Sequence, residues 1–391
     1  MYLMTTIGQT GAKDALRVAI IGGGFMAGVH ATAARAAGMV PVALLSSTAS
    51  SARVAASRLG IEEAVGSIDE LLSTGIDVVH VCSPNVTHLP YSLQALEAGA
   101  HVICEKPIAT ASDDAAQMLV AAQRAGRIGA VPFVYRFHPM VREAREAVKT
   151  GSLGQILTIE GRYLQDWLLG SADDNWRVDS TIGGQSRAFA DIGSHLSDLI
   201  EFVTGDRIEW VSARTRVVHE RRGQSTNVST EDIAAVLFET KNGALGTLMV
   251  SQLAPGRKNK LTLEISGDRR SVAFDQEQPE SLWIGGRGGS RTIVRDPEVL
   301  SSDAARLSRL PAGHPQGYQD AFNAFVADCY EAMSGQAPEG LPTFADGLRA
   351  VRVTEAVMAS ARTSDWIRVE EHETHREEAP SRLPAAAIHS V

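Results

Sequence analysis

Two short segments of the sequence carry side chains that can move a proton. Glu105 and Lys106 directly follow an apolar run of strand length, His101–Cys104, and Asp191 lies four residues before His195. Lysine, imidazole and carboxylate groups act as general acids and bases when burial and neighbouring charges adjust their pKa. On an α-helix, Asp191 and His195 would share one face. A catalytic role is one reading; a surface Glu-Lys pair and a helix-capping Asp near an unrelated His are the structural alternative.

The chain also contains a glycine-rich segment of the kind that binds dinucleotides. Gly22-x-Gly24-x-x-Ala27 follows the strand-like run Leu16–Ile21 and opens a helical stretch. The first Gly permits a tight turn, the second lets the backbone approach a pyrophosphate, and the small third residue lets the helix pack closely. The helix N-terminus then offers free N–H groups to phosphates. We predict a cofactor site here, with a purely structural turn as the alternative, and add to it Phe25 and Met26.

The end of the second predicted strand bears on the choice of cofactor. Val40–Leu45 is followed by Ser46, Ser47 and Thr48 and then by Arg53, without an Asp or Glu. A carboxylate at this place would bind the ribose hydroxyls of NAD and disfavour the 2′-phosphate of NADP. Hydroxyls and an Arg can instead bind a phosphate. The segment therefore permits NADP without excluding NAD, and a helix-capping cluster is the structural alternative.

The elements that position these residues follow from the periodicity. Short apolar runs alternate with helical segments up to about Val134, which predicts a parallel sheet covered on both faces. Later strand-like runs alternate apolar and polar residues, as in an antiparallel sheet with one covered face. We predict a flexible N-terminus (1–14), an α/β Rossmann dinucleotide-binding domain (15–134), an α+β domain with a large, mostly antiparallel, open-faced sheet (135–370), C-terminal helices (317–333 and 344–361), a loop near the pocket mouth (286–312) and an exposed tail (371–391).

Composition excludes several classes of function. The chain has 37 basic and 46 acidic side chains, a net charge of −9, and lacks the basic clusters that nucleic-acid binding needs. No apolar run reaches the roughly 20 residues of a membrane helix, and no signal peptide precedes the first strand. The spacing of Cys82, Cys104 and Cys329 fits neither a disulfide framework nor a metal site, which indicates a cytoplasmic protein. Asp191 and His195 lack a third ligand with suitable spacing, so we predict no metal.

Five motifs in order resemble the Gfo/Idh/MocA (glucose–fructose oxidoreductase / inositol dehydrogenase) family. They are GGGFMA (22–27), SPNVTH (83–88), CEKP (104–107), YRFHP (135–139) and GGQSRAFADIGSHLSD (183–198), and the resemblance covers roughly residues 15–370. It implies that Lys106, Asp191 and His195 are catalytic and line a substrate pocket beside the nicotinamide. It also implies a homo-oligomer, a dimer or tetramer, built through the second sheet. Further cofactor contacts are expected from Lys106 itself and from Ser83, Asn85, His88, Glu105, Arg136, Trp176 and Arg177.

Two tryptophans lie among polar residues, in Tyr163–Trp167 and Asn175–Arg177. Aromatic rings pack on the C–H faces of sugars while amides and carboxylates bind hydroxyls; core packing is the alternative. Within the family the pattern resembles the sugar 3-dehydrogenases, the branch that includes levoglucosan dehydrogenase, and NAD is slightly favoured by that resemblance. The expected substrate contacts are Lys106, Tyr135, Gln165, Asp166, Trp167, Asp191, His195 and His314.

The resemblance implies an NAD(P)-dependent oxidoreductase acting on a carbohydrate. The expected reaction oxidises a secondary hydroxyl, at pyranose C3, of a sugar, glycoside or anhydro sugar. An NADPH-dependent reductase of keto or anhydro sugars, an inositol dehydrogenase and a redox-assisted glycoside hydrolase stay open within the family. A non-catalytic sensor of nucleotides or sugars is the alternative from a different class.

Overall fold

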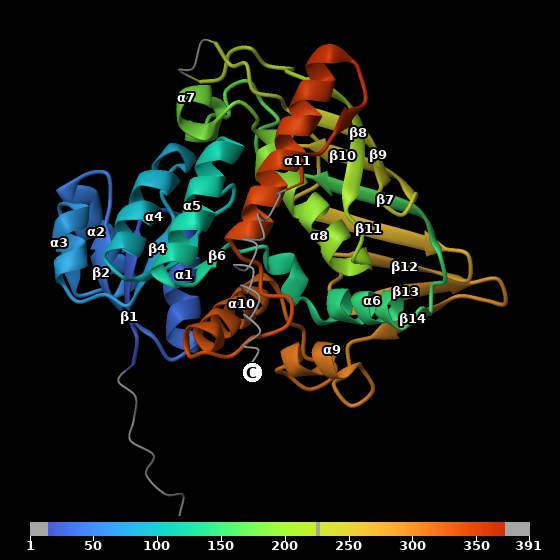
Figure 1. The fold of residues 1–391 in the computed structure, drawn as a ribbon, viewed down its shortest axis with the longest axis horizontal. Coiled ribbons are helices and arrows are strands. Elements are labelled where there is room, and N and C mark those ends of the chain that lie inside the picture. Colours follow the sequence, from blue (N-terminus) through green and yellow to red (C-terminus); the bar gives the residue numbers. More distant parts are fainter. Residues whose placement is uncertain (1–14, 224–226, 372–391) are drawn as a thin grey trace, which may run out of the picture.

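A computed structural model describes residues 15–223 and 227–371 of the chain. The predicted N-terminus (1–14) and residues 372–391 of the predicted tail lie outside the described residues. Two sheets dominate the molecule, one at each side, and the helix α11 (Phe344–Thr363) runs between them (Figure 1). Any site formed by residues of both sheets must therefore lie near this central junction.

The first sheet is parallel, with the strand order β3-β2-β1-β4-β5-β6 in the described residues. Its apolar central strands are buried on both faces by helices, as the uninterrupted hydrophobic runs predict. The predicted Rossmann fold is confirmed. Its strands are β1 (Arg17–Ile21), β2 (Val40–Leu45), β3 (Glu63–Val65), β4 (Val78–Val81), β5 (His101–Cys104) and β6 (Gly129–Ala130). Its helices are α1 (Phe25–Ala36), α2 (Ala49–Leu59), α3 (Ile68–Ser73), α4 (His88–Glu97) and α5 (Ser112–Ala125).

The second sheet has the order β14-β13-β12-β11-β7-β10-β9-β8-β15 in the described part of the chain. Its pairings are antiparallel except that β10 runs parallel to β7, so the predicted mostly antiparallel sheet is confirmed. The strands are β7 (Ile156–Leu164), β8 (Ile208–Arg216), β9 (Ile233–Thr240), β10 (Leu245–Ser251), β11 (Lys260–Gly267), β12 (Arg270–Asp275), β13 (Ser281–Gly286), β14 (Arg291–Val294) and β15 (Ile367–Arg368).

The predicted loop at 286–312 is wrong in part. It contains the strand β14 and the short helix α9 (Ser302–Leu307). The glycines and serines that flank these elements hide them in the sequence. A four-residue edge strand needs one partner only, and β14 finds it in β13, where Leu282 pairs with Ile293.

One face of the second sheet is covered by helices and the other is open. The helices α6 (Pro139–Lys149), α8 (Ser194–Thr204) and α11 pack on the covered face, where Ile159, Leu248 and Leu263 are buried together with Leu196 of α8. On the open face the alternating residues of the same strands face outward, and Leu237 and Leu245 are both more than half exposed. The alternation in the sequence thus reports which face is covered.

The C-terminal helices join the two sheets. The helix α10 (Tyr318–Met333) packs on α1, and its Phe322 and Phe325 belong to the same buried cluster as Ile20 of β1. Next along the chain, α11 contacts both α5 of the first domain and β8 of the second. The C-terminal part of the chain therefore returns to the dinucleotide-binding domain, and the division at residue 134 stays a prediction.

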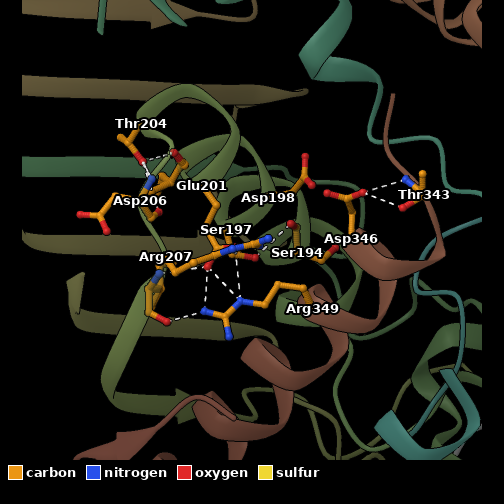
Figure 2. Close-up of polar contacts among 12 residues, drawn as sticks. Ser194, Ser197, Asp198, Glu201, Thr204, Asp206, Arg207, Thr343, Asp346 and Arg349 are labelled. Carbon is orange, nitrogen blue, oxygen red and sulfur yellow. Dashed lines mark hydrogen bonds and ion pairs between the residues drawn. The ribbon is translucent and has the colours of Figure 1, made fainter. Parts of the chain in front are cut away.

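Polar contacts fix α8, the helix that carries His195. Glu201 of α8 accepts hydrogen bonds from Arg349 of α11 (2.8 Å) and from the backbone N–H of Ile208 (3.0 Å), and it also pairs with Arg207 (Figure 2). Because Glu201 is 9% exposed and has several donors, its buried charge is compensated. This network holds α8 in one position relative to α11 and β8.

Candidate active site

The glycine-rich turn has the shape that a dinucleotide pyrophosphate needs. Gly22 has φ = 120°, and a Cβ atom there would lie 2.6 Å from the carbonyl oxygen of Cys82. A Cβ on Gly24, the N-cap of α1, would meet nothing within 4 Å, and Ala27 is fully buried. Gly22 is therefore required by the close approach to β4, whereas Gly24 leaves open space at the helix N-terminus, where anions bind. The turn fits the cofactor that the sequence predicts.

Two neighbouring residues of this turn are exposed differently. Phe25 is 76% exposed at the start of α1, while the sulfur of Met26 lies 4.0 Å from the hydroxyl of Tyr318 on α10. Arg58 of α2, which sequence reasoning missed, donates to the carbonyl oxygen of Gly23 at 2.7 Å. Arg58 and Tyr318 thus support the turn from two sides.

The hydroxyl cluster after β2 caps a helix. Thr48 Oγ1 accepts from the backbone N–H of Ser51 (3.0 Å), and Ser51 Oγ donates to Ser46 Oγ (3.0 Å). Ser47 and Arg53 are exposed, and Arg53 makes no hydrogen bond or ion pair with another described residue. The capping interpretation is therefore real, and it leaves Arg53 and Ser47 facing solvent.

The two proton-transfer segments meet although they are 85 residues apart. Lys106 Nζ lies 2.7 Å from Asp191 Oδ1 and also donates to the backbone carbonyl of Asp191 at 2.8 Å. Their side chains are 13% and 14% exposed. Lys106 lies just after β5 of the first sheet. Asp191 lies in the segment that leads into α8, one of the helices that cover the second sheet. The ion pair therefore marks the place where the dinucleotide-binding domain contacts the second domain.

The segment that carries Asp191 is not a regular α-helix. Residues Phe189–Gly193 form a π-helical turn, η4, that leads into α8. A Cβ on Gly193 would lie 2.5 Å from the ring of Phe189, so only glycine allows this winding. Asp191 therefore lies on a π-turn rather than on the α-helix that the sequence suggested, and His195 lies in the first turn of α8. Single π-turns of this kind are frequent at functional sites.

The charges of this cluster shift the pKa values of its members. Burial alone would raise the pKa of Asp191, but Lys106 and Arg177, whose Nε lies 3.6 Å from Asp191 Oδ1, hold it well below its usual value. Burial, followed by the charge of Lys106, lowers the pKa of His195 well below its usual value. At neutral pH the cluster therefore holds an ionised Asp191 and a neutral His195.

Three aromatic rings surround the imidazole of His195. Its ring centroid lies 5.8 Å from that of Phe133, 4.9 Å from that of Tyr135 and 6.2 Å from that of Tyr163. His195 Nδ1 is buried and has no hydrogen-bond partner among the described residues. The rings fix the imidazole plane without engaging this nitrogen.

Behind His195, two tyrosines and an asparagine form a closed hydrogen-bond ring. Tyr163 Oη donates to Asn259 Oδ1 (2.7 Å), and Asn259 Nδ2 donates to Tyr135 Oη (3.1 Å). The Tyr135 hydroxyl must then donate to Tyr163 Oη, 2.5 Å away. Gln165 Nε2 also donates to Asn259 Oδ1 (2.9 Å), and Trp167 Nε1 donates to Gln165 Oε1 (2.8 Å). This series of hydrogen bonds thus extends from the half-exposed Trp167 to the residues behind His195.

Sequence reasoning missed Asn259 and also Gln252. Gln252 is fully buried directly after β10 and donates to Asp191 Oδ2 at 2.9 Å. Its Oε1 is buried without a partner among the described residues. The signal that could have found Gln252 is the parallel pairing of β10 with β7, which brings the ends of both strands together. That pairing is not visible in the sequence.

Most of the other predicted cofactor residues lie near this cluster. Asn85 Nδ2 donates to the carbonyl of Gly183 (2.8 Å), and both ring nitrogens of His88 face backbone carbonyls, those of Pro107 and Ser83. His88 therefore links the segment after β4 to the segment after β5. The guanidinium of Arg177 lies 4.3 Å from the ring of Trp176 and close to Asp191.

Three predicted site residues make their polar contacts with residues other than Lys106, Asp191 and His195. Asp166 accepts from the N–H of Gly256 (3.0 Å) and from Lys258 (2.7 Å), so it fixes the loop after β10. His314 is exposed, and its backbone carbonyl accepts from Arg295. The guanidinium of Arg136 is buried between Asp198 and Asp346. These contacts give no support to the predicted ligand contacts of the three residues.

Residues 15–223 and 227–371 contain no group of three or more His, Cys, Asp or Glu side chains that could hold a metal ion. Within the same residues, no helix is both long and apolar enough to cross a membrane.

The fold and the site define an oxidoreductase in which a dinucleotide cleft meets a second domain at a lysine–carboxylate pair. The family described as "Oxidoreductase family, NAD-binding Rossmann fold" matches residues 16–133, and "GFO/IDH/MocA C-terminal domain" matches residues 141–273. The chain belongs to the GFO/IDH/MocA family of oxidoreductases, which confirms the resemblance.

Individual relatives agree with this assignment. Levoglucosan dehydrogenase of Pseudarthrobacter phenanthrenivorans is 30% identical over 390 residues, which cover 90% of this chain and 98% of that protein. A crystal structure of an oxidoreductase domain protein from Kribbella flavida is 34% identical, with a TM-score of 0.84 over 91% of this chain and all of that one. Levoglucosan dehydrogenase in complex with NADH and levoglucosan is 28% identical, with a TM-score of 0.85 over 91% of this chain and all of that one.

Proposed function

We propose that the protein is an NAD-dependent dehydrogenase that oxidises a secondary hydroxyl of a pyranose, at C3, to a keto sugar. The observation that carries the proposal is the contact between Lys106 and Asp191 beside a neutral His195, at the junction of the dinucleotide cleft with an aromatic, amide-lined wall. The similarity to levoglucosan dehydrogenase supports a sugar, glycoside or anhydro sugar as the substrate.

The side chains divide the proton chemistry between them. Lys106 has three N–H donors, of which Asp191 takes two, so one remains for the oxygen of the substrate hydroxyl. The sequence allows Lys106 to accept the hydroxyl proton directly or through His195. The contacts favour the second route, because the amino group of Lys106 is already engaged by Asp191 whereas His195 is neutral and can accept the proton.

A bound nicotinamide supplies the hydride acceptor. Transfer of the hydroxyl proton to His195, together with loss of hydride from the carbon that bears this hydroxyl, leaves a carbonyl. The ammonium of Lys106 stabilises the negative charge that develops on the oxygen meanwhile. The cofactor would be held by the turn Gly22–Ala27, the segments that end in His88 and Lys106, and Arg177. The sugar would lie against Tyr135, Gln165 and Trp167. It would also lie next to Lys106, Asp191 and His195, which together form the Lys106 cluster.

NAD is the proposed cofactor because a relative that aligns along almost the whole chain has a structure with NADH. NADP is the second candidate, since Ser47 and Arg53 are exposed after β2 without a carboxylate. The same segment favours the second candidate function, an NADPH-dependent reductase of keto or anhydro sugars. An inositol dehydrogenase and a non-catalytic sensor stay as further alternatives.

The open face of the second sheet supports a homo-oligomer, a dimer or tetramer. Leu157, Leu237, Leu245 and Met249 are between 41% and 58% exposed on neighbouring strands β7, β9 and β10. A hollow of about 740 Å³ lies over the same strands. Exposed apolar patches of this kind mark interfaces, and we propose that a second copy of this chain covers this face.

The test is an activity panel with the purified protein. Sugars, glycosides, anhydro sugars and inositols are each offered with NAD and with NADP, and the keto products are offered with the reduced cofactors. The dehydrogenase proposal predicts reduced cofactor with a pyranose and NAD. Faster turnover of a keto sugar with NADPH would select the reductase instead, and cofactor binding without turnover of any compound would select the sensor.

A further inference from the structure

Three buried ionisable side chains next to the site play no part in the chemistry above. His30 of α1 and His80 of β4 are both fully buried, and Glu105 after β5 is 8% exposed. His30 Nε2 lies 3.1 Å from Glu105 Oε1, and His30 Nδ1 lies 2.9 Å from His80 Nδ1. The three groups form one line from the core of the first sheet to the residue that precedes Lys106.

The proton positions in this line follow from its ends. Burial alone would raise the pKa of Glu105, but the hydrogen bond from His30 lowers it, so Glu105 is ionised and can only accept. Burial lowers the pKa of His80, so His80 is neutral. One arrangement of hydrogen bonds fits both contacts: His30 Nε2 donates to Glu105, and His80 Nδ1 donates to His30 Nδ1. His80 fixes the tautomer of His30, and His30 fixes the carboxylate.

Packing prevents the line from rearranging. The ring of His30 meets His80 edge-on (centroids 5.0 Å apart) and also meets Phe322 of α10 (4.7 Å). The second oxygen of Glu105 accepts from the backbone N–H of Lys106 at 3.2 Å. The Glu105 side chain is nevertheless 10% exposed, so it is not sealed into the core.

The position of Glu105 in the sheet shows which part of a dinucleotide it would face. In the order 3-2-1-4-5-6 a dinucleotide lies across the crevice at the β1–β4 boundary, with its adenosine half toward β2. The nicotinamide half therefore lies toward β4 and β5, and Glu105 ends β5. The oxidised nicotinamide ring carries a positive charge that the reduced ring lacks. A fixed carboxylate on this side attracts the oxidised form more strongly.

We propose that His30 and His80 are positioning residues that hold the Glu105 carboxylate toward the nicotinamide half of the cleft, and that this charge weights cofactor binding toward NAD⁺ over NADH. The inference rests on the proposed use of NAD. It assigns a role to two histidines that make no contact with Lys106, Asp191 or His195.

The experiment measures the dissociation constants of NAD⁺ and NADH separately, by calorimetry and by NADH fluorescence, for the wild type and a set of variants. His30→Phe removes the donor to Glu105, and Glu105→Gln removes the charge. Both should weaken NAD⁺ roughly three- to tenfold while NADH binding changes by less than about twofold. The double variant should show no further change in the ratio, because both substitutions act on one charge.

Conservative and control variants separate positioning from packing. His30→Gln keeps an N–H donor and His80→Asn keeps the donor at the Nδ1 position, so both should retain much of the wild-type ratio. His101→Asn changes a histidine at the opposite end of β5, where Nδ1 accepts from the N–H of Ile128, and should leave the ratio unchanged. If His30→Phe does not fold, Glu105→Gln and His30→Gln still decide.

An equal loss of NAD⁺ and NADH affinity, or an unchanged ratio in Glu105→Gln, would overturn the inference and leave only a packing role. Absence of binding of either cofactor to the wild-type protein would contradict the proposed NAD dependence itself. The two failures are therefore distinguishable without knowledge of the sugar.

Discussion

Replacement of Lys106 by Met tests the proposed proton chemistry most sharply, because the unbranched apolar side chain is retained as far as Cε while the amino group and its donors are lost. Of three N–H donors, two are given to Asp191 and one is left for the substrate oxygen. Loss of one preorganised, charged donor to a developing oxyanion costs about 3 kcal/mol in the transition state, or roughly a hundredfold in kcat.

The folded state should tolerate the same change. Asp191 keeps Gln252 at 2.9 Å and Arg177 at 3.6 Å in Lys106→Met, so its carboxylate is not orphaned. The expected loss of stability is about 1.5–3 kcal/mol, the contribution of a hydrogen bond to a charged group. The affinity for NADH should fall far less than kcat, since the turn Gly22–Ala27 is untouched.

The assay combines the initial rate of NADH formation with NADH titration and urea unfolding. Lys149→Met is the matched control, because that lysine is 48% exposed and forms only surface ion pairs with Glu146 and Glu339, which contribute about 0–1 kcal/mol. A kcat for Lys106→Met within about threefold of the wild type would refute the reasoning, because one oxyanion donor is expected to contribute far more.

Three further predictions follow from other contacts. Gln252→Met removes the N–H donor to Asp191 Oδ2 and should lower kcat roughly tenfold with unchanged NADH affinity; an unchanged kcat would exclude a positioning role for Gln252. Leu237→Glu places a charge on the open sheet face and should reduce the mass measured by light scattering, whereas an unaltered mass would place the interface elsewhere. Burial lowers the pKa of His138 to about 4, so the unfolded chain gains a proton below pH 6.5 that the folded protein refuses. Stability in urea should therefore fall by about 2 kcal/mol for this group between pH 7 and pH 5, and a smaller loss in His138→Asn checks the assignment.

The glycine turn could be predicted because local chemistry dictates it, whereas the joint role of Lys106, Asp191 and His195 was expected from the resemblance to the family. Gly22 is required by a close backbone contact. Any sequence that makes the same turn therefore shows the same spacing between the two glycines, Gly22 and Gly24. Uninterrupted apolar runs predicted the first sheet, and the alternation of apolar and polar residues predicted the second, since both patterns report burial directly. What the pattern could not predict is the π-turn at Asp191, because the winding depends on how Phe189 packs beside Gly193.

Site residues whose position depends on long-range strand pairing could not be predicted from the sequence. Gln252 and Asn259 reach the site only because β10 lies parallel to β7 and β11 lies beside it. The contact of His30 with Glu105 could not be predicted either, because it depends on how α1 packs over Glu105. Conversely, the polarity of Asp166 suggested a sugar ligand, while its Oδ2 accepts hydrogen bonds from Gly256 and Lys258 in the loop after β10. Local residue type predicts what a side chain can bind, and the fold decides which partner reaches it first.

The central claim is that the Lys106 cluster oxidises a pyranose hydroxyl with NAD, and one measurement tests it directly. The wild-type protein is incubated with NAD and each of a panel of pyranoses, including levoglucosan, while reduced nicotinamide is recorded by absorbance and the product by NMR. The account predicts NADH in equal amount to a 3-keto sugar. Binding of NAD without NADH formation across the panel, or a carbonyl at a carbon other than C3, would contradict it.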